Sequence, residues 1–330
     1  MRSFAKVLAW IGIALVTVGC AGTQPGSSNR GIPSRIRVLA HAPTPGSGSG
    51  ISQLTGFVDG KPAFLSYIDA AHWTVSAMGA SPVSLSTVSY AHAFLVAFED
   101  GTAVGEYDGG TFVYRKGNSG WTAASFPGVT EAVLDAQNAK LIGKVGSGFA
   151  IVDIATAAQT PITLPADAAL YFAKSNWLVY GTASTFHVRN VQSGTDWQEA
   201  IVSGDTNQFP YALNASGGVV GESSNGSVGR AVYWEPGTGA AHVVDSFTGG
   251  TVEPGWISDD GARFAINIAT GSTYRSYLYV DGAKYPVSNL VGGSGVSYVY
   301  GLNESGTTGF GLIDPSGDRA SLVALSIGYR

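Results

Sequence analysis

Apolar and polar residues alternate in short segments along most of this chain. Runs of four to seven residues rich in Val, Ile, Phe and Tyr are each followed by a turn that contains Asn, Asp, Ser or Gly. Segments of this length and composition, bounded by turn residues, are typical of β-strands. Beyond the N-terminal region, no stretch of 12 or more residues keeps a 3.6-residue hydrophobic period. The pattern therefore predicts an all-β protein with very little helix.

The strand pattern repeats along the chain. One copy reads YALNASGGVVGESSNGSVGRAVYWEPGTGAAHVVD (residues 211–245), and similar copies begin near positions 56, 95, 132, 171, 255 and 300. The second strand of a copy often carries a glycine: Gly105, Gly143, Gly181, Gly221 and Gly309. The third strand carries an aromatic or β-branched anchor: Phe64, Phe112, Phe149, Phe186, Val232 and Tyr277. A fourth strand closes the unit with an aromatic residue: Trp73, Trp121, Trp197 or Tyr285.

This repeat has the length of one propeller blade. The third-strand anchors are spaced by 37 to 48 residues, and a period of ~40 residues with four short strands is the signature of a β-propeller. Dividing residues 36–330 by ~42 predicts seven blades, with six or eight as alternatives. The last copy ends early, so we expect the strand near Ile36–Ala40 to complete it and close the ring.

Several repeats resemble known propeller families. The stretch ALNASGGVVGESSNGSVGRAVYWEPGTG (212–239) resembles bacterial extracellular HAF-type repeats, which are built around "IN..G.VVG" and "AF.W" segments. The stretches ISDDGARFAI (257–266) and FAIVDIATAAQTPIT (149–163) resemble the WD40-like repeats of TolB-type periplasmic propellers, although Asp259 stands where those have Pro. These motifs are spread over residues 56–314. The resemblance implies the propeller fold and a role as an interaction platform, although a fold alone decides no function.

The N-terminus has the pattern of an export signal. Arg2 and Lys6 precede a 12-residue apolar run, Val7–Val18, which is too short for a spanning helix of ~20 residues and fits the apolar region of a signal peptide. The run ends in Val16-Thr17-Val18-Gly19-Cys20, which resembles the bacterial lipobox apart from Thr17. The resemblance implies cleavage before Cys20 and lipid attachment to it. Cys20 is the only cysteine of the chain, so no disulfide can form within the molecule.

These features predict three segments. Residues 1–19 form a lipoprotein signal peptide, residues 20–35 form the lipid attachment site and a Gly/Ser/Pro-rich tether, and residues 36–330 form the propeller. We expect an extracytoplasmic protein that contacts the membrane only through its lipid. Ala21 rather than Asp after the cysteine favours the outer membrane.

Charge and motifs exclude several function classes. The net charge is −5, charged residues make up 12% of the chain, and no run of Lys or Arg occurs. Nucleic acid is therefore not expected as a partner, because neutralising phosphates requires clustered basic residues. No catalytic elbow, metalloprotease or phosphate-loop motif is present, and the five histidines form no metal-ligand pattern. We expect no cofactor and no metal.

One set of aromatic residues falls at an equivalent position of the repeat. Aligning the copies on Ser258, Asn214 and Asn303 places Tyr171, Tyr211 and Tyr300 at the start of the first strand, while Gly255, followed by Trp256, takes the same place in another copy. The first strand of a blade begins near the propeller axis. We expect Tyr171, Tyr211, Trp256 and Tyr300 to surround one mouth of the channel, either as a binding site or as packing between blades.

The leading interpretation is a lipid-anchored propeller of the cell envelope that binds or scaffolds a protein or glycan partner. The alternative is a carbohydrate-active hydrolase or lyase, whose catalytic carboxylates would have to come from different blades. Buried titratable groups meeting at one mouth would favour the enzyme. A mouth lined by tyrosines and small polar residues would favour the binding module.

Overall fold

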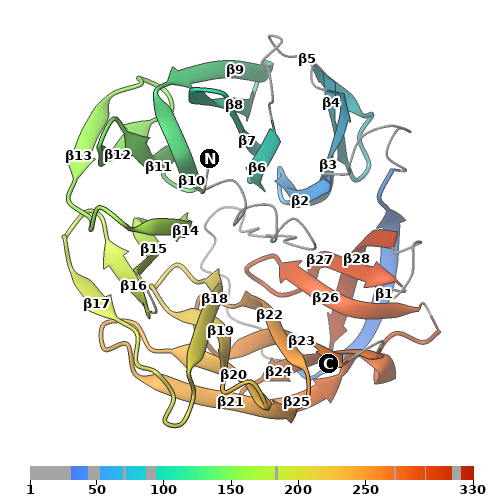
Figure 1. Cartoon of the computed structure of the whole chain (residues 1–330). Coiled ribbons are helices and arrows are strands. Elements are labelled where there is room, and N and C mark those ends of the chain that lie inside the picture. Colours follow the sequence, from blue (N-terminus) through green and yellow to red (C-terminus); the bar gives the residue numbers. More distant parts are fainter. Residues whose placement is uncertain are drawn as a thin grey trace.

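The strands of this chain, β1 to β28, form seven four-stranded antiparallel sheets that stand as blades around a central axis (Figure 1). The computed structural model describes residues 31–43, 53–69, 72–86, 94–182, 185–270, 273–293, 295–313 and 321–330. Within these ranges the helical structure is one short 3₁₀ turn, η1 (Val287–Asn289). The all-β prediction and the count of seven blades are both confirmed.

Each blade runs from an innermost strand to an outermost strand. The innermost strands are β2 (Gln53–Val58), β6 (Phe94–Glu99), β10 (Val129–Asp135), β14 (Ala169–Lys174), β18 (Asn207–Leu213), β22 (Thr251–Ile257) and β26 (Val296–Leu302). The second strands are β3 (Lys61–Asp69), β7 (Thr102–Tyr107), β11 (Lys140–Val145), β15 (Trp177–Thr182), β19 (Val219–Ser224), β23 (Arg263–Thr270) and β27 (Thr308–Ile313). The third strands are β4 (His72–Ala77), β8 (Gly110–Gly117), β12 (Gly148–Asp153), β16 (Thr185–Asn190), β20 (Val228–Trp234), β24 (Thr273–Val280) and β28 (Ser321–Tyr329). The outermost strands are β5 (Val83–Ser86), β9 (Gly120–Pro127), β13 (Gln159–Ile162), β17 (Asp196–Gln198), β21 (Ala241–Thr248), β25 (Ala283–Pro286) and β1 (Pro33–His41).

The two ends of the chain complete one blade together. Strand β1 pairs antiparallel with β28, with Ile36 opposite Ile327. The side chain of Ile36 is buried, and its backbone N–H donates to the carbonyl of Leu290 at 2.8 Å. The expected closure of the ring by the N-terminal strand is confirmed, and the strand extends beyond the expected 36–40 segment at both ends.

The predicted strand order of the first blade was wrong by one strand. Phe64 lies on the second strand β3 and Trp73 on the third strand β4, not on the third and fourth strands. The reason is local: Asp59 and Gly60, with positive φ values of 50° and 70°, form the turn that ends the innermost strand. The aromatic residues of this copy lie one strand earlier in the blade than those of the other copies, so they do not mark the same strands.

Seven hydrophobic clusters make up the core, each at one interface between neighbouring blades. For example, the rings of Trp73 and Phe112 join the first two blades, with centroids 4.8 Å apart, and Phe186 meets Trp234 at 4.9 Å between the fourth and fifth. Because a four-stranded sheet cannot bury both of its faces alone, each blade depends on its two neighbours. The fold is therefore stabilised by a closed ring of interfaces.

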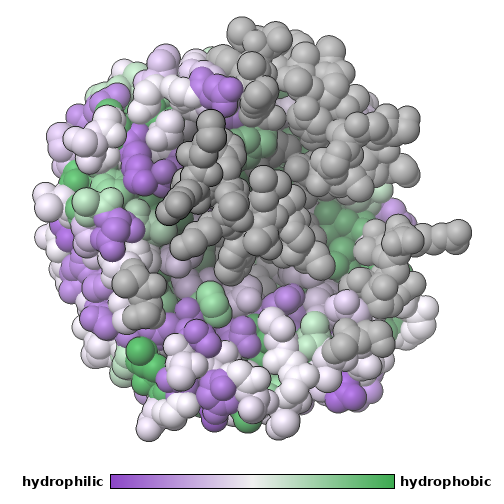
Figure 2. Space-filling view, viewed as in Figure 1, coloured by the Kyte–Doolittle hydropathy of each residue, from purple (hydrophilic) through white to green (hydrophobic). Residues whose placement is uncertain are grey.

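The ring has two faces that differ in their loops. We call the face where the innermost strands begin, next to the loops that join successive blades, the linker face. We call the opposite face, where the innermost strands turn into the second strands, the turn face. On the side of the molecule in Figure 2, hydrophilic and near-neutral residues are mixed, with hydrophobic residues scattered among them. This agrees with a chain in which only 12% of the residues are charged.

Candidate functional site

A β-bulge recurs on the innermost strands. The pairing with the second strand shifts register at Tyr171 in β14, at Tyr211 in β18 and at Gly255 in β22. Strands β6, β10 and β26 show comparable shifts, whereas the described part of β2 pairs regularly. The bulge brings the backbones so close that a Cβ atom at Gly221 would overlap the carbonyl oxygen of Phe209. In the fifth blade, the second-strand glycine therefore allows the close approach at the bulge.

The four aromatic residues singled out in the sequence all lie on innermost strands, but in two different environments. Tyr171 is 43% exposed, and its ring lies over Gly181, where a Cβ would come within 2.7 Å of the ring. Tyr211 is half-buried. Trp256 and Tyr300 are only 5% and 6% exposed and belong to hydrophobic clusters that involve the seventh blade. Tyr171 and Tyr211 are thus the two whose rings a ligand could reach directly, and the binding role of all four stays a prediction.

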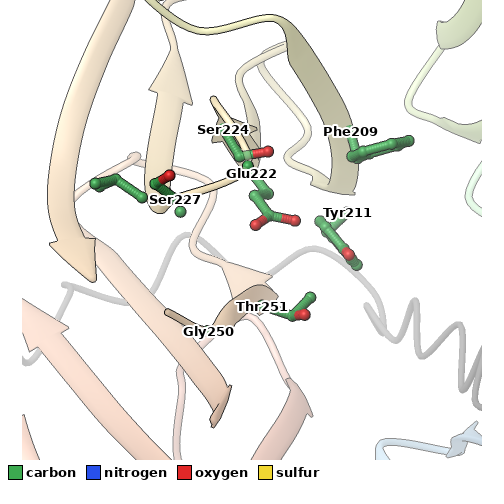
Figure 3. Close-up of a pocket in the computed structure, with 10 residues that line it drawn as sticks. Phe209, Tyr211, Glu222, Ser224, Ser227, Gly250 and Thr251 are labelled. Carbon is green, nitrogen blue, oxygen red and sulfur yellow. The ribbon is translucent and has the colours of Figure 1, made fainter. Parts of the chain in front are cut away.

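A pocket of about 360 Å³ lies between the fifth and sixth blades on the linker face (Figure 3). Its walls come from β18, β19, the turn before β20 and the loop that leads into β22. The side chains that line it are those of Phe209, Tyr211, Glu222, Ser224, Ser227 and Thr251. Its volume falls within the ~300–1,000 Å³ range of small-molecule sites, so it is the candidate functional site.

Glu222 is the charged residue of this pocket. Its side chain is 7% exposed, and its carboxylate points into the space between Tyr211 and Ser227 (Figure 3). One oxygen, Oε1, accepts a long hydrogen bond of 3.4 Å from the N–H of Val252. Gly229 makes room for this oxygen, because a Cβ there would come within 2.9 Å of it. The pocket therefore holds a carboxylate whose backbone surroundings are adapted to it.

The electrostatic surroundings of Glu222 are negative. Its pKa is raised to about 7, chiefly by burial; the hydrogen bond from Val252 opposes this rise, and the charges of Glu253 and Asp205 add to it. Burial also raises the pKa of Glu253. Asp205 forms an ion pair with Arg230. Glu222 and Glu253 form no ion pair with any basic side chain of the described residues.

Two tyrosines of the seventh blade lie within electrostatic reach of Glu253. Burial raises the pKa values of Tyr298 and Tyr300 far above the ordinary value, and the nearby charge of Glu253 adds to both shifts. Both hydroxyl groups are buried and have no hydrogen-bond partner among the described residues, which is uncommon for buried hydroxyls in proteins.

The turn face carries a second group of charges, which pair with one another. Lys174 of the fourth blade is 3% exposed, and its Nζ lies 2.8 Å from Oδ1 of Asp259 in the sixth blade. Gln137 of the third blade donates to Glu304 of the seventh blade at 3.4 Å. Burial raises the pKa of Glu99 well above its usual range, and the positive charge of Lys174 opposes this rise. The blades are therefore connected across the axis on this face.

The carboxylate of Asp135, also on the turn face, is hydrogen-bonded within the protein. Its side chain is 1% exposed and accepts hydrogen bonds from the N–H groups of Ser175 and Asn176 in the next blade, at 3.1 and 2.8 Å. Its Oδ2 also accepts from Nδ2 of Asn138 at 2.8 Å. This carboxylate is a connection between blades, with its oxygens occupied by the protein.

Buried titratable groups occur on both faces of the ring. At the turn face, Lys174 pairs with Asp259 and lies within electrostatic reach of Glu99, whereas at the linker face Glu222 lies within electrostatic reach of Glu253. A tyrosine and small polar residues, Tyr211, Ser224, Ser227 and Thr251, line the pocket of the linker face together with Glu222. The contrast makes the linker face the better candidate for ligand binding.

Sequence reasoning missed Glu222 and Glu253. The one signal was that the segment Val-Gly-Glu occurs at the same repeat position twice, at 104–106 and 220–222. Among the described residues, no group of three or more His, Cys, Asp or Glu side chains is arranged to hold a metal ion. In the same part of the chain, no helix has the length and apolar content needed to cross a membrane. Cys20 lies outside the described residues.

Comparison with known proteins identifies the class of fold. No protein-family model matches the chain, and no curated protein matches its sequence. An oligogalacturonate lyase in complex with manganese is similar in structure, with a TM-score of 0.55 and 11% identity over 81% of this chain and 86% of that chain. The Cps50 (Swd1) β-propeller domain of Myceliophteria thermophila has a TM-score of 0.53 and 14% identity over 89% and 100% of the two chains.

TolB from Acinetobacter baumannii also matches, at a TM-score of 0.42 and 12% identity over 64% of this chain and 58% of that chain, a distance at which the likeness carries no further argument. The class of protein is therefore the seven-bladed β-propeller, a fold that by itself decides no function.

Proposed function

We propose that this chain is a lipid-anchored β-propeller of the cell envelope that binds a protein or glycan partner on its linker face. The observation that carries the proposal is the contrast between the two faces. On the turn face the buried Lys174 is paired with Asp259, whereas the linker face has a pocket with reachable aromatic residues and a carboxylate that forms no ion pair with the described residues. Aromatic residues with a polar tip are favoured at binding sites.

The exposed aromatic residues support the same face. Among the exposed large hydrophobic side chains of the described residues, Phe94 and Tyr171 are the ones on innermost strands, at 50% and 43% exposure. Both are near the start of their strands, as Phe209 and Tyr211 are in the fifth blade. A partner that approaches along the axis would therefore meet aromatic rings from three blades.

The anchor is the part of the proposal that rests on sequence alone. Replacing Cys20 with Ser should remove acyl labelling and move the protein from the membrane fraction to the soluble fraction. Acylation and membrane association that survive the replacement would refute the lipoprotein assignment.

The binding role is tested with the full chain and three variants of it. Tyr171→Ala and Tyr211→Ala should weaken binding to envelope glycans and envelope proteins at least tenfold, with unchanged circular dichroism. Val243→Ala is the matched control, because this side chain is 48% exposed on the outermost strand β21, far from the axis. Equal binding by all three variants would show that the linker face is not the site.

A carbohydrate-active hydrolase or lyase is the second candidate, and one observation favours it. Glu222, with its pKa raised to about 7, lies within electrostatic reach of the carboxylate of Glu253, and pairs of carboxylates with separated pKa values serve as acid and base on glycosidic bonds. Incubating the glycans that bind with the protein distinguishes the two. New reducing ends or unsaturated sugars that the Glu222→Gln variant does not produce would establish an enzyme. Glycans that stay intact would support the binding module.

A further inference from the structure

Among the described residues, the buried Lys174 of the turn face has a partner of opposite charge, whereas Glu222 of the linker face has none. On the turn face, the carboxylate of Asp259 meets Lys174, and the Arg263 guanidinium donates to the carbonyls of Ser305 and Glu304. In the pocket of the linker face, Glu222 is 93% buried. A carboxylate withdrawn from water without a cation nearby is unfavourable. A positive charge is the group that would stabilise it most.

The walls of the pocket suit a cation as well. Phe209 and Tyr211 line it together with Glu222, and an ammonium over an aromatic face gains cation–π attraction. Thr251 also lines the pocket, and Glu253 follows it by two residues on β22, so both side chains leave the strand on the same side. Hydroxyl oxygens of Ser227 and Thr251 are available as further acceptors for N–H donors.

The geometry of the carboxylate selects the kind of cation. Oε1 of Glu222 already accepts from the N–H of Val252 and lies against Gly229. A guanidinium binds a carboxylate best through both oxygens at once, whereas an ammonium is a point charge that needs one. With Oε1 already in contact with the backbone, Glu222 favours an ammonium.

Building on the proposed function, we propose that the pocket between the fifth and sixth blades binds a protonated alkylamine, with Glu222 as its counter-charge and with Phe209 and Tyr211 around its stem. The amine has two sources of identical chemistry: a free diamine, or the side chain of a lysine that a protein partner inserts. Both place an ammonium at the end of an aliphatic chain, and the ~300–1,000 Å³ range of ligand pockets includes a cavity of this size.

The charge state of Glu222 makes the binding depend on pH. The titratable and charged groups around it are Glu253 of β22, Asp205 before β18 with its partner Arg230, and Tyr211. With a pKa of about 7, the ionised fraction of Glu222 rises ~tenfold between pH 6 and pH 8, while an alkylamine with a pKa of ~10.4 stays protonated. The affinity for the amine should rise by about the same factor.

The test is calorimetric titration of the full chain with 1,5-diaminopentane, with 1,5-pentanediol as its neutral counterpart, and with a lysine peptide beside its acetyl-lysine form. The variants are Glu222→Gln and its matched control Glu106→Gln, which changes the equivalent residue of the second blade. We expect binding of the amine or the lysine peptide, at least a tenfold loss in Glu222→Gln and none in Glu106→Gln, and no binding of the neutral forms. The stronger of the two amines identifies the source.

Two results would overturn the inference. One is equal binding of the diamine and the diol, and the other is amine binding that Glu222→Gln leaves unchanged in a folded protein. If a neutral glycan binds and Tyr211→Ala abolishes this binding while neither amine binds, the amine inference fails and the proposed binding role stands. If neither glycan, protein nor amine binds at the linker face, both fail.

Discussion

The turn that follows the fifth innermost strand rests on one buried asparagine. Asn214 is fully buried, and its Oδ1 accepts from the N–H of Gly218 at 2.7 Å and from the N–H and hydroxyl of Ser216 at 3.2 and 2.8 Å. Its Nδ2 donates to the carbonyl of Ser258 in the sixth blade at 3.2 Å. One side chain therefore closes its own turn and connects two blades, and we predict a large loss of stability in Asn214→Ala.

The magnitude follows from which groups lose their partner. The N–H of Gly218 becomes a buried donor with no acceptor, which costs ~1–3 kcal/mol. The carbonyl of Ser258 keeps a second donor, the N–H of Gly261 at 2.9 Å, so only the net value of one hydrogen bond is lost there, ~0.5–1.5 kcal/mol. The free energy of unfolding should fall by ~1.5–4.5 kcal/mol in total.

The assay is urea unfolding followed by tryptophan fluorescence, with Asn225→Ala as the matched control. Asn225 accepts from the N–H groups of Ser227 and Val228, both at 3.0 Å, but in an exposed turn where water can replace it. That variant should lose less than ~1 kcal/mol. Asn214→Asp keeps the acceptors and removes the donor to Ser258, so it isolates the contact between blades. Equal losses for Asn214→Ala and Asn225→Ala would refute the reasoning from burial.

Three further predictions concern other buried groups. Burial raises the pKa of Glu199 to about 8, above the ~4.3 of an unfolded chain. The stability that Glu199 contributes is therefore lost as the pH rises from ~4.3 through about 8. Glu199→Gln should reduce this decline of the free energy of unfolding, measured by urea unfolding between pH 5 and pH 8. Lys174→Met should destabilise by ~3–5 kcal/mol because it leaves buried carboxylates without their cation, and adding Glu99→Gln should recover part of the loss; an undiminished stability would contradict the assigned contact. Phe112→Ala should cost ~3–5 kcal/mol, whereas Phe94→Ala, exposed at 50%, should be close to neutral in the same unfolding experiment.

The sequence is informative about features that a single blade determines. The second-strand glycines, such as Gly105 and Gly309, lie where the repeat placed them, because each is required by its own hairpin and bulge. The completion of the last blade by residues 36–40 was also predictable, since the final copy lacks an outermost strand. Both inferences depend only on local chain geometry and on the need to leave no open edge.

Contacts around the axis could not be predicted in this way. Lys174 and Asp259 are 85 residues apart and in blades that are not neighbours. Their distance depends on how far each blade is rotated when the ring closes, and no local pattern reports this rotation. The same applies to the pocket, because Glu222 and Thr251 belong to different blades. The burial of Trp256 likewise follows from packing against the next blade, which the repeat position alone does not indicate.

One position of the second strand, occupied by Glu106, Glu222 and Asn267, can either connect two blades or face a ligand pocket. Glu106 in the second blade accepts from the N–H of Ala132 in the next blade at 2.7 Å, and Asn267 in the sixth blade accepts from the N–H of Val299 at 3.2 Å. Glu222 in the fifth blade reaches the next blade in the same way, but at 3.4 Å, and its carboxylate also faces the pocket. Where this contact is short, the residue holds two blades together. Where this contact is long, the carboxylate retains hydrogen-bonding capacity for a ligand. The second and fifth blades share the Val-Gly-Glu segment and differ in the length of this contact, so the fifth blade is the one to test.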